Sequence, residues 1–144
     1  MLAMGLVTCT VVVLRYGFDT GAVVLQESVI YLHATAFMLG IAYTLRLDGH
    51  VRVDVLYARL DTRQRAWVNL AGHVLFLLPV ALTIGIGSLP YVAASWRILE
   101  GSPEVGGIPA VFVLKTLIPV MAALLCLQGL AEIARSATHL ARTR

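Results

Sequence analysis

The sequence predicts an all-α integral membrane protein with four transmembrane helices, short loops and both termini in the cytoplasm. Of its 144 residues, 59% are hydrophobic and only 13% are charged, whereas soluble domains carry about 25% charged residues. A soluble domain of this length could not bury so much apolar surface, so a bilayer must act as its solvent. Four apolar segments account for most of the chain, which predicts a single membrane domain over residues 1–144.

The four expected spans cover residues of about 1–16, 24–46, 66–96 and 109–133. The first is short, because a span needs about 17 to 25 residues. A signal peptide is the competing interpretation, but no positive charge precedes this apolar run and no small-residue cleavage site follows it. Arg15 and Tyr16 are instead typical of an interfacial belt that closes a helix. We therefore expect a span with an abbreviated start.

The third segment is longer than a bilayer requires, so it should tilt or project beyond the membrane. Pro79 within it predicts a bend, and Asp61 followed by Gln64 is typical of a helix cap before it. The fourth segment opens with Pro109, which suits a first helical position. The two glycines just before Pro109 indicate a turn rather than a phosphate-binding loop, because no strand or GK[ST] pattern accompanies them.

Arginine residues predict the orientation. The loop between the second and third segments carries five of them, namely Arg46, Arg52, Arg59, Arg63 and Arg65. The C-terminal tail adds Arg135, Arg142 and Arg144, whereas the other two loops carry few basic residues. Lys and Arg in short loops stay on the cytoplasmic side. Two spans separate the arginine-rich regions, so both lie on one side and both termini are expected in the cytoplasm.

Ionisable side chains within spans are costly and are therefore functional candidates. Glu27, with Gln26 beside it, is expected near the outer end of the second segment, where solvation is inexpensive. Lys115 should lie about two turns into the fourth segment. From there it can extend its amine to the outer surface or pair with Glu104 or Glu100.

His33 and His73 lie in neighbouring segments and leave open a second class of protein, a haem- or quinone-binding membrane anchor. By helix rise their depths differ by roughly 5 to 10 Å, which suits a single haem poorly. The sequence contains no HExxH or Walker motif and no basic face with interleaved aromatic residues. We therefore expect no enzyme activity, no cofactor, no metal and no nucleic-acid partner.

Several motifs resemble one known family, in order and over nearly the whole chain. In the first half they are Arg15-Tyr16, Leu25-Gln26-Glu27, Tyr43-Thr44-Leu45-Arg46 and Asp48-Gly49-His50-Val51-Arg52-Val53-Asp54. In the second half they are Tyr91-Val92-Ala93-Ala94-Ser95-Trp96, Glu104-Val105-Gly106-Gly107-Ile108-Pro109, Lys115-Thr116-Leu117-Ile118-Pro119 and the closing Leu127-Gln128-Gly129. The chain resembles the small permease subunit (DctQ type, four helices) of tripartite ATP-independent periplasmic (TRAP) transporters.

The resemblance implies a non-catalytic scaffold in the inner membrane of a bacterium. Its partners would be a large permease, a periplasmic substrate-binding protein and membrane lipids, in the sodium-driven import of organic anions such as carboxylates. The candidate contact residues are Arg15, Gln26, Glu27, Arg46, Asp48, His50, Arg52, Asp54, Glu104 and Lys115.

The loop between the second and third segments yields a testable prediction. Charge reversal at Arg52 or Asp54 should weaken complex assembly or transport more than reversal at Arg142, because alternating Arg and Asp residues exceed what orientation alone requires. Co-purification of each variant with the large permease measures the effect. Equal losses at all three positions would argue against a special role for this loop.

Overall fold

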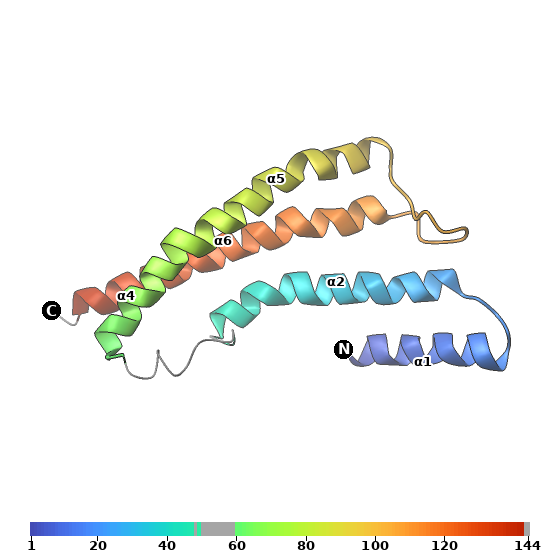
Figure 1. Ribbon diagram of the computed structural model, residues 1–144, viewed down its shortest axis with the longest axis horizontal. Coiled ribbons are helices and arrows are strands. Elements are labelled where there is room, and N and C mark those ends of the chain that lie inside the picture. The colour runs from blue at the N-terminus through green and yellow to red at the C-terminus, as the bar shows by residue number, and fades with distance from the viewer. Residues whose placement is uncertain (48, 50–59, 143–144) are drawn as a thin grey trace. The chain divides into compact units, whose positions relative to one another are not determined.

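The computed structural model describes residues 1–47, 49 and 60–142, and within them every regular element is a helix (Figure 1). The helices are α1 (Leu2–Gly17), α2 (Val23–Arg46), α4 (Thr62–Gly72), η1 (His73–Leu77), α5 (Leu78–Arg97) and α6 (Val111–Arg142). The all-α prediction is confirmed for these residues. Four of the candidate contact residues, Asp48, His50, Arg52 and Asp54, lie outside the described residues.

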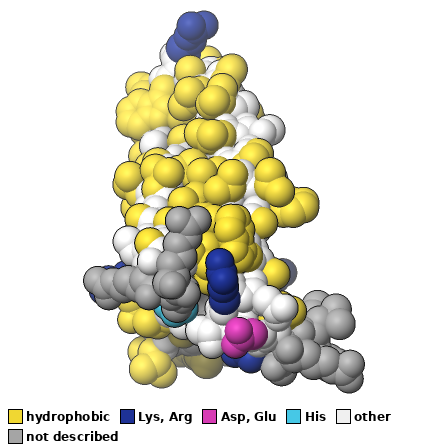
Figure 2. All heavy atoms as spheres, turned by 90° about the vertical axis from the view of Figure 1, so that its left-hand side faces the viewer, with side chains coloured by type: hydrophobic (Ala, Val, Ile, Leu, Met, Phe, Trp, Pro, Cys, Tyr) yellow, Lys and Arg dark blue, Asp and Glu magenta, His cyan; other side chains and the backbone are white. Residues whose placement is uncertain are grey.

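Three helical stretches in the described part of the chain are long and apolar enough to cross a membrane. They contain 24 residues in α2, 36 in the continuous run from α4 to α5, and 31 in α6. Hydrophobic side chains cover most of the coloured surface in Figure 2, and large ones such as Phe37 and Phe76 are 61% and 70% exposed. Helix α1 has 16 residues and a length of about 24 Å. Its role as a fourth span stays a prediction.

The third long helix starts at residue 62, four residues before the expected span, because its predicted cap lies upstream of the apolar stretch. The Asp61 carboxylate accepts hydrogen bonds from the Thr62 backbone, at 2.7 Å, and from the Gln64 backbone. In return, Gln64 Oε1 accepts one from the Asp61 backbone at 3.0 Å. This reciprocal arrangement is the predicted capping box, which satisfies amide groups that the first helical turn leaves unpaired.

An irregular turn interrupts this helix just before Pro79. Residues His73–Leu77 form a π-helical turn, in which the Leu78 amide donates to the carbonyl of His73. Proline has no amide hydrogen and its ring clashes with the carbonyl four residues earlier. A wider turn relieves that clash, so the helix forms a π-turn on the N-terminal side of Pro79. The bend predicted from Pro79 and from Gly85, Gly87 and Pro90 stays a prediction.

Helix α6 and the expected fourth span do not have the same ends. The helix begins at Val111, so Pro109 precedes it instead of occupying its first position. It continues to Arg142, beyond residue 133, where the expected span ends. The Arg135 guanidinium donates to Glu132 at 2.8 Å across one turn, and the residues that follow include two alanines and a leucine, which favour a helix. The helix therefore extends beyond its apolar stretch.

The chain divides into two compact units, one of Met1–Gly40 and Ser88–Ile118, the other of Ile41–Gly87 and Pro119–Arg144. In the second unit small residues bring two helices together. Ala81 and Ala122 are only 2% and 1% exposed, and a Cβ on Gly85 would lie 3.2 Å from the Ala122 Cβ. Membrane helices associate through such small residues, because van der Waals packing replaces the hydrophobic effect there.

The close approach at Gly85 predicts a position-specific loss of stability. Gly85→Leu should lower the thermal midpoint, because overpacking costs about 1–3 kcal/mol. Gly87→Leu is the matched control, since no described atom lies within 4 Å of a Cβ placed there. Circular dichroism melts of the purified variants in detergent test the difference. Equal midpoints for the two variants would disprove the contact.

Candidate functional site

The α5–α6 loop, residues 98–110, begins with a tight reversal at the end of α5. The Leu99 amide donates to the carbonyl of Trp96 at 3.3 Å, and the Glu100 amide donates to that of Ser95 at 3.0 Å. These two bonds form a Schellman motif. Leu99 has φ of +45°, a conformation that costs a residue other than glycine about 1–2 kcal/mol. The reversal brings Glu100 back to the start of α6.

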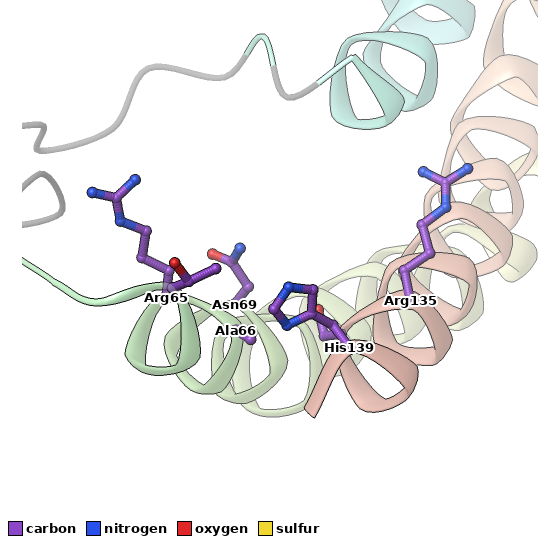
Figure 3. A pocket seen from close by; sticks show the side chains of 7 residues that line it. Arg65, Ala66, Asn69, Arg135 and His139 are labelled. Carbon is purple, nitrogen blue, oxygen red and sulfur yellow. The ribbon is translucent and has the colours of Figure 1, made fainter. Parts of the chain in front are cut away.

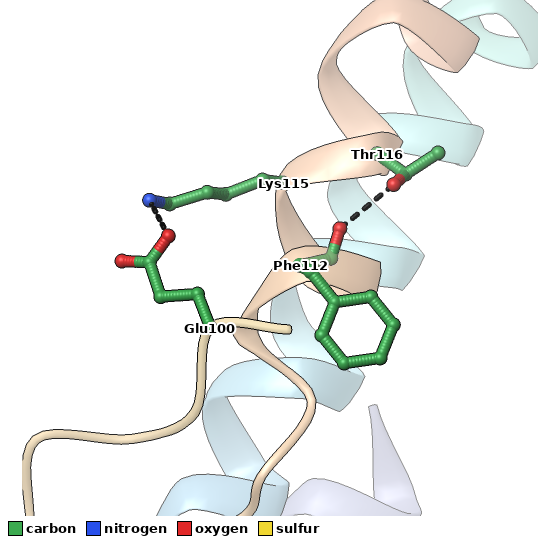
Figure 4. A network of polar contacts seen from close by, with 4 residues as sticks. All are labelled: Glu100, Phe112, Lys115 and Thr116. Carbon is green, nitrogen blue, oxygen red and sulfur yellow. Dashed lines mark hydrogen bonds and ion pairs between the residues drawn. The ribbon is translucent and has the colours of Figure 1, made fainter. Parts of the chain in front are cut away.

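Lys115 of α6 contacts two groups at this position. Its Nζ lies 2.5 Å from Glu100 Oε2 (Figure 4) and 4.1 Å from the centroid of the Tyr91 ring. The side chains of Lys115 and Glu100 are 15% and 33% exposed. An aromatic face attracts a cation and so supplements the ion pair. Of the two partners that the sequence left open for Lys115, the structure selects Glu100.

The ion pair changes the acidity of Glu100, which lies outside the membrane-spanning helices. The hydrogen bond from Lys115 holds the pKa of the Glu100 carboxyl below its ordinary value of 4.5. The nearby Ser95 hydroxyl lowers this pKa further, although its oxygen is outside hydrogen-bond geometry. A carboxyl group whose pKa is lower in the folded chain than in the unfolded chain stabilises the fold at pH values above the unfolded pKa. This stabilisation is lost as the pH falls through the folded pKa.

Glu27 of α2 binds the middle of the same loop. Its Oε2 accepts a hydrogen bond from the Ile108 backbone at 2.6 Å, and its Oε1 accepts one from the Ser102 hydroxyl. Within the loop, the Ser102 amide donates to the Ile108 carbonyl at 3.2 Å, so the two segments that hold the carboxylate also bond to each other. The carboxylate therefore joins residues more than 70 positions apart in sequence.

Two glycines allow the loop backbone to approach this carboxylate. Gly106 has φ of +79°, and the Gly107 amide donates to the carbonyl of Glu104 at 3.0 Å, which confirms the predicted turn. A Cβ on Gly107 would lie only 2.7 Å from Glu27 Oε1, and even closer to the side chain of Ser102 that binds this carboxylate. A side chain at position 107 would consequently push the loop away from α2.

A third attachment joins the end of α5 to the first turns of α6. The Trp96 indole donates to Thr116 Oγ1 at 2.9 Å, and Thr116 in turn donates to the Phe112 carbonyl at 2.7 Å (Figure 4). The rings of Trp96 and Phe112 meet edge to face, with centroids 4.6 Å apart. Aromatic pairs favour this geometry. Together with the Lys115 pair, these contacts fix both ends of the loop.

Of the predicted contact residues that the structure describes, Glu27 and Lys115 contribute their side chains to this network. Arg15 and Arg46 are exposed in the last turns of α1 and α2, and Gln26 is half-buried on α2. The Glu104 side chain is exposed, while its backbone takes part in the turn. Sequence reasoning missed Ser102 and the Ile108 amide, because a serine and a backbone group carry no distinctive pattern.

The two candidate histidines belong to different units of the chain and have different surroundings. His33 stacks on Phe37 with ring centroids 6.1 Å apart, and His73 belongs to the π-helical turn. Among the described residues, no three His, Cys, Asp or Glu side chains are grouped so that they could hold a metal ion.

Long apolar helices, joined by a loop that is bonded back onto them, define a multi-pass membrane protein. Over residues 4–139 the chain matches the family described as the DctQ component of tripartite ATP-independent periplasmic transporters. The chain therefore belongs to this family, as a small permease component of a TRAP transporter, and the resemblance drawn from the motifs is confirmed. No curated protein and no solved structure is significantly similar to it. Membership of a transporter family does not favour the haem- or quinone-anchor alternative.

The acidity of Glu100 predicts a pH dependence. The thermal midpoint of the protein should fall as the pH drops from 7 towards 4, because protonated Glu100 no longer pairs with Lys115. Glu100→Gln should have a lower midpoint than the native chain at pH 7 and a smaller fall on acidification. Glu104→Gln, an exposed glutamate in the same loop, should melt like the native chain. Thermal melting curves of the three proteins at pH 7 and pH 4 test this prediction. A Glu100→Gln variant with the same thermal midpoints as the native chain would refute it.

Proposed function

We propose that the chain is a non-catalytic scaffold for the large permease of its TRAP transporter. The complex imports organic anions such as carboxylates, driven by sodium, and receives them from a periplasmic binding protein. The observation that carries this proposal is the attachment of the α5–α6 loop to both of its neighbours. Glu27 ties it to α2, and Lys115 ties it to α6.

The charged groups of this network serve the fold rather than a solute. The Glu27 carboxylate accepts two hydrogen bonds, and the Lys115 ammonium is paired with a carboxylate. Binding of a sodium ion or an organic anion by either group would require breaking these contacts. Transport proteins that carry the solute place such groups at the middle of the membrane on broken helices. A fixed loop instead suits a subunit that keeps its shape while a neighbour moves.

The proposed topology places this loop in the periplasm. Four spans, with α1 as the first, put both termini in the cytoplasm of a bacterium and leave two loops on the outer side. The α5–α6 loop is the longer of these and would form part of the surface on which the binding protein docks. The exposed apolar faces of the helices then contact lipid or the large permease, because neither can face water.

Co-purification and reconstitution test the proposal. The tagged chain, extracted from its host membrane in a mild detergent, should retain a large multi-span permease that mass spectrometry identifies. In liposomes with an inward sodium gradient, a panel of radiolabelled carboxylates should enter only when permease, small subunit and binding protein are all present. Uptake by the small subunit alone, or its purification without any permease, would refute the scaffold role.

A further inference from the structure

Two large apolar side chains, Ile98 and Leu99, are exposed where the chain reverses after α5. They are 73% and 63% exposed. Leu99 has φ of +45°, a conformation that glycine or asparagine adopts more readily than leucine. The backbone therefore gives no reason for a leucine at position 99, and the reason has to lie in the contacts of its side chain.

A bond to α6 holds this reversal at the level of the helix ends. The Phe112 amide donates to the carbonyl of Glu100 at 3.3 Å, and Figure 4 shows Glu100 beside the first turns of α6. The apolar helical runs on the two sides of the loop end at Arg97 and begin at Val111. The two exposed side chains therefore lie where both runs leave the apolar part of a bilayer.

The residues just before the reversal are typical of the boundary between lipid and water. Trp96 is 47% exposed, and tryptophan is enriched at this boundary. Arg97 is exposed as well, and a long basic side chain can extend its charge from this depth to water. Exposed apolar side chains at the same depth meet lipid rather than bulk water.

The other end of the same helical run has a different character. There the first turns of α4 and the last turns of α6 line a polar cavity of about 300 Å³, with Arg65 and Arg135 among its residues (Figure 3). Arg65 donates to the Leu60 carbonyl and Arg135 to Glu132, so both guanidinium groups are bonded within the chain. The cavity presents polar groups, whereas the reversal after α5 presents apolar ones.

The tip of the α5–α6 loop also differs from the reversal. Val105 is 97% exposed and lies in the turn in which the Gly107 amide donates to the carbonyl of Glu104. The neighbouring Glu104 side chain is exposed. A charged side chain is costly inside a bilayer, so we expect this tip to lie in water.

We propose that Ile98 and Leu99 form an apolar wedge that inserts among the lipids at the membrane surface and anchors the α5–α6 loop there. The partner is the lipid itself, at the depth where headgroups and acyl chains meet. The wedge requires only that α5 and α6 cross a bilayer, so the proposal does not depend on the scaffold role. Coverage of the same side chains by the large permease or by the binding protein is the alternative that the experiment separates.

Spin labelling of the full chain in liposomes of phosphatidylethanolamine and phosphatidylglycerol tests the proposal. Ile98→Cys and Leu99→Cys, each in a chain whose two native cysteines are replaced by alanine, carry a nitroxide. Its collisions with oxygen, which concentrates in lipid, are compared with its collisions with a nickel chelate that stays in water. Glu104→Cys is the aqueous control, and Leu89→Cys is the lipid control, because Leu89 is 54% exposed on α5.

The wedge predicts a lipid-like environment at both positions. A leucine side chain prefers an apolar environment over water by about tenfold or more, so the oxygen-to-nickel ratio at positions 98 and 99 should exceed that at 104 by about tenfold and resemble that at 89. A ratio equal to that at 104 would overturn the proposal, since these liposomes contain neither permease nor binding protein. Few collisions with either reagent would also overturn it, because the chain itself would then cover the side chains.

Substitution of one member of the wedge provides a second test. With the label at Ile98→Cys, Leu99→Asn should shift the ratio towards nickel, because asparagine tolerates the left-handed conformation but is too polar to favour lipid. Val105→Asn is the matched control and should leave the ratio unchanged. Circular dichroism spectra like that of the native chain show that the labelled variants are folded. No shift with Leu99→Asn, or equal shifts in the two variants, would contradict the wedge.

Discussion

The hydrogen bonds of the Glu27 carboxylate determine the geometry of the α5–α6 loop. A carboxylate that is partly removed from water needs hydrogen-bond donors, because polar groups left without partners cost free energy. Ser102 and the Ile108 amide supply them, and the loop must fold back over α2 to do so. Gly107 is required at the contact, since a Cβ there would lie 2.7 Å from Glu27 Oε1 and even closer to the side chain of Ser102. The carboxylate on α2 and the serine that binds it together restrict the course of the loop and the residue at position 107.

The contacts between helices can be explained by the absence of a hydrophobic effect inside a bilayer. Helices in lipid gain little from burying apolar side chains, so close packing and polar bonds hold them together. Both occur here, each within its own unit. Gly85 and Ala122 let two helices approach closely in the second unit, and the Trp96 indole bonds Thr116 in the first. The buried side chains among the described residues are accordingly small, apart from Val92.

The long helices and the helix cap could be predicted from the sequence, because each depends on residues that are close together in the chain. The contacts between distant residues could not. The apolar runs predicted the long helices, and Asp61 with Gln64 predicted the cap that starts one of them. Helix α6 continues past the expected span because hydropathy marks the end of a span, whereas helix propensity decides the end of a helix. The reversal at Leu99 was unpredictable, since glycine usually occupies that position. The role of Glu27 depends on partners more than 70 residues away, and no local pattern encodes such a pairing.

Hydrogen exchange at the Ile108 amide tests most directly whether the Glu27 carboxylate fixes the α5–α6 loop. This amide donates to Glu27 Oε2 at 2.6 Å, so it should exchange slowly in the folded chain. In Glu27→Ala the protection of Ile108 should fall sharply, while the amides in the middle of α6 keep theirs. Exchange of the Ile108 amide at the rate of an unstructured peptide in the native chain, or unchanged protection in Glu27→Ala, would contradict the account.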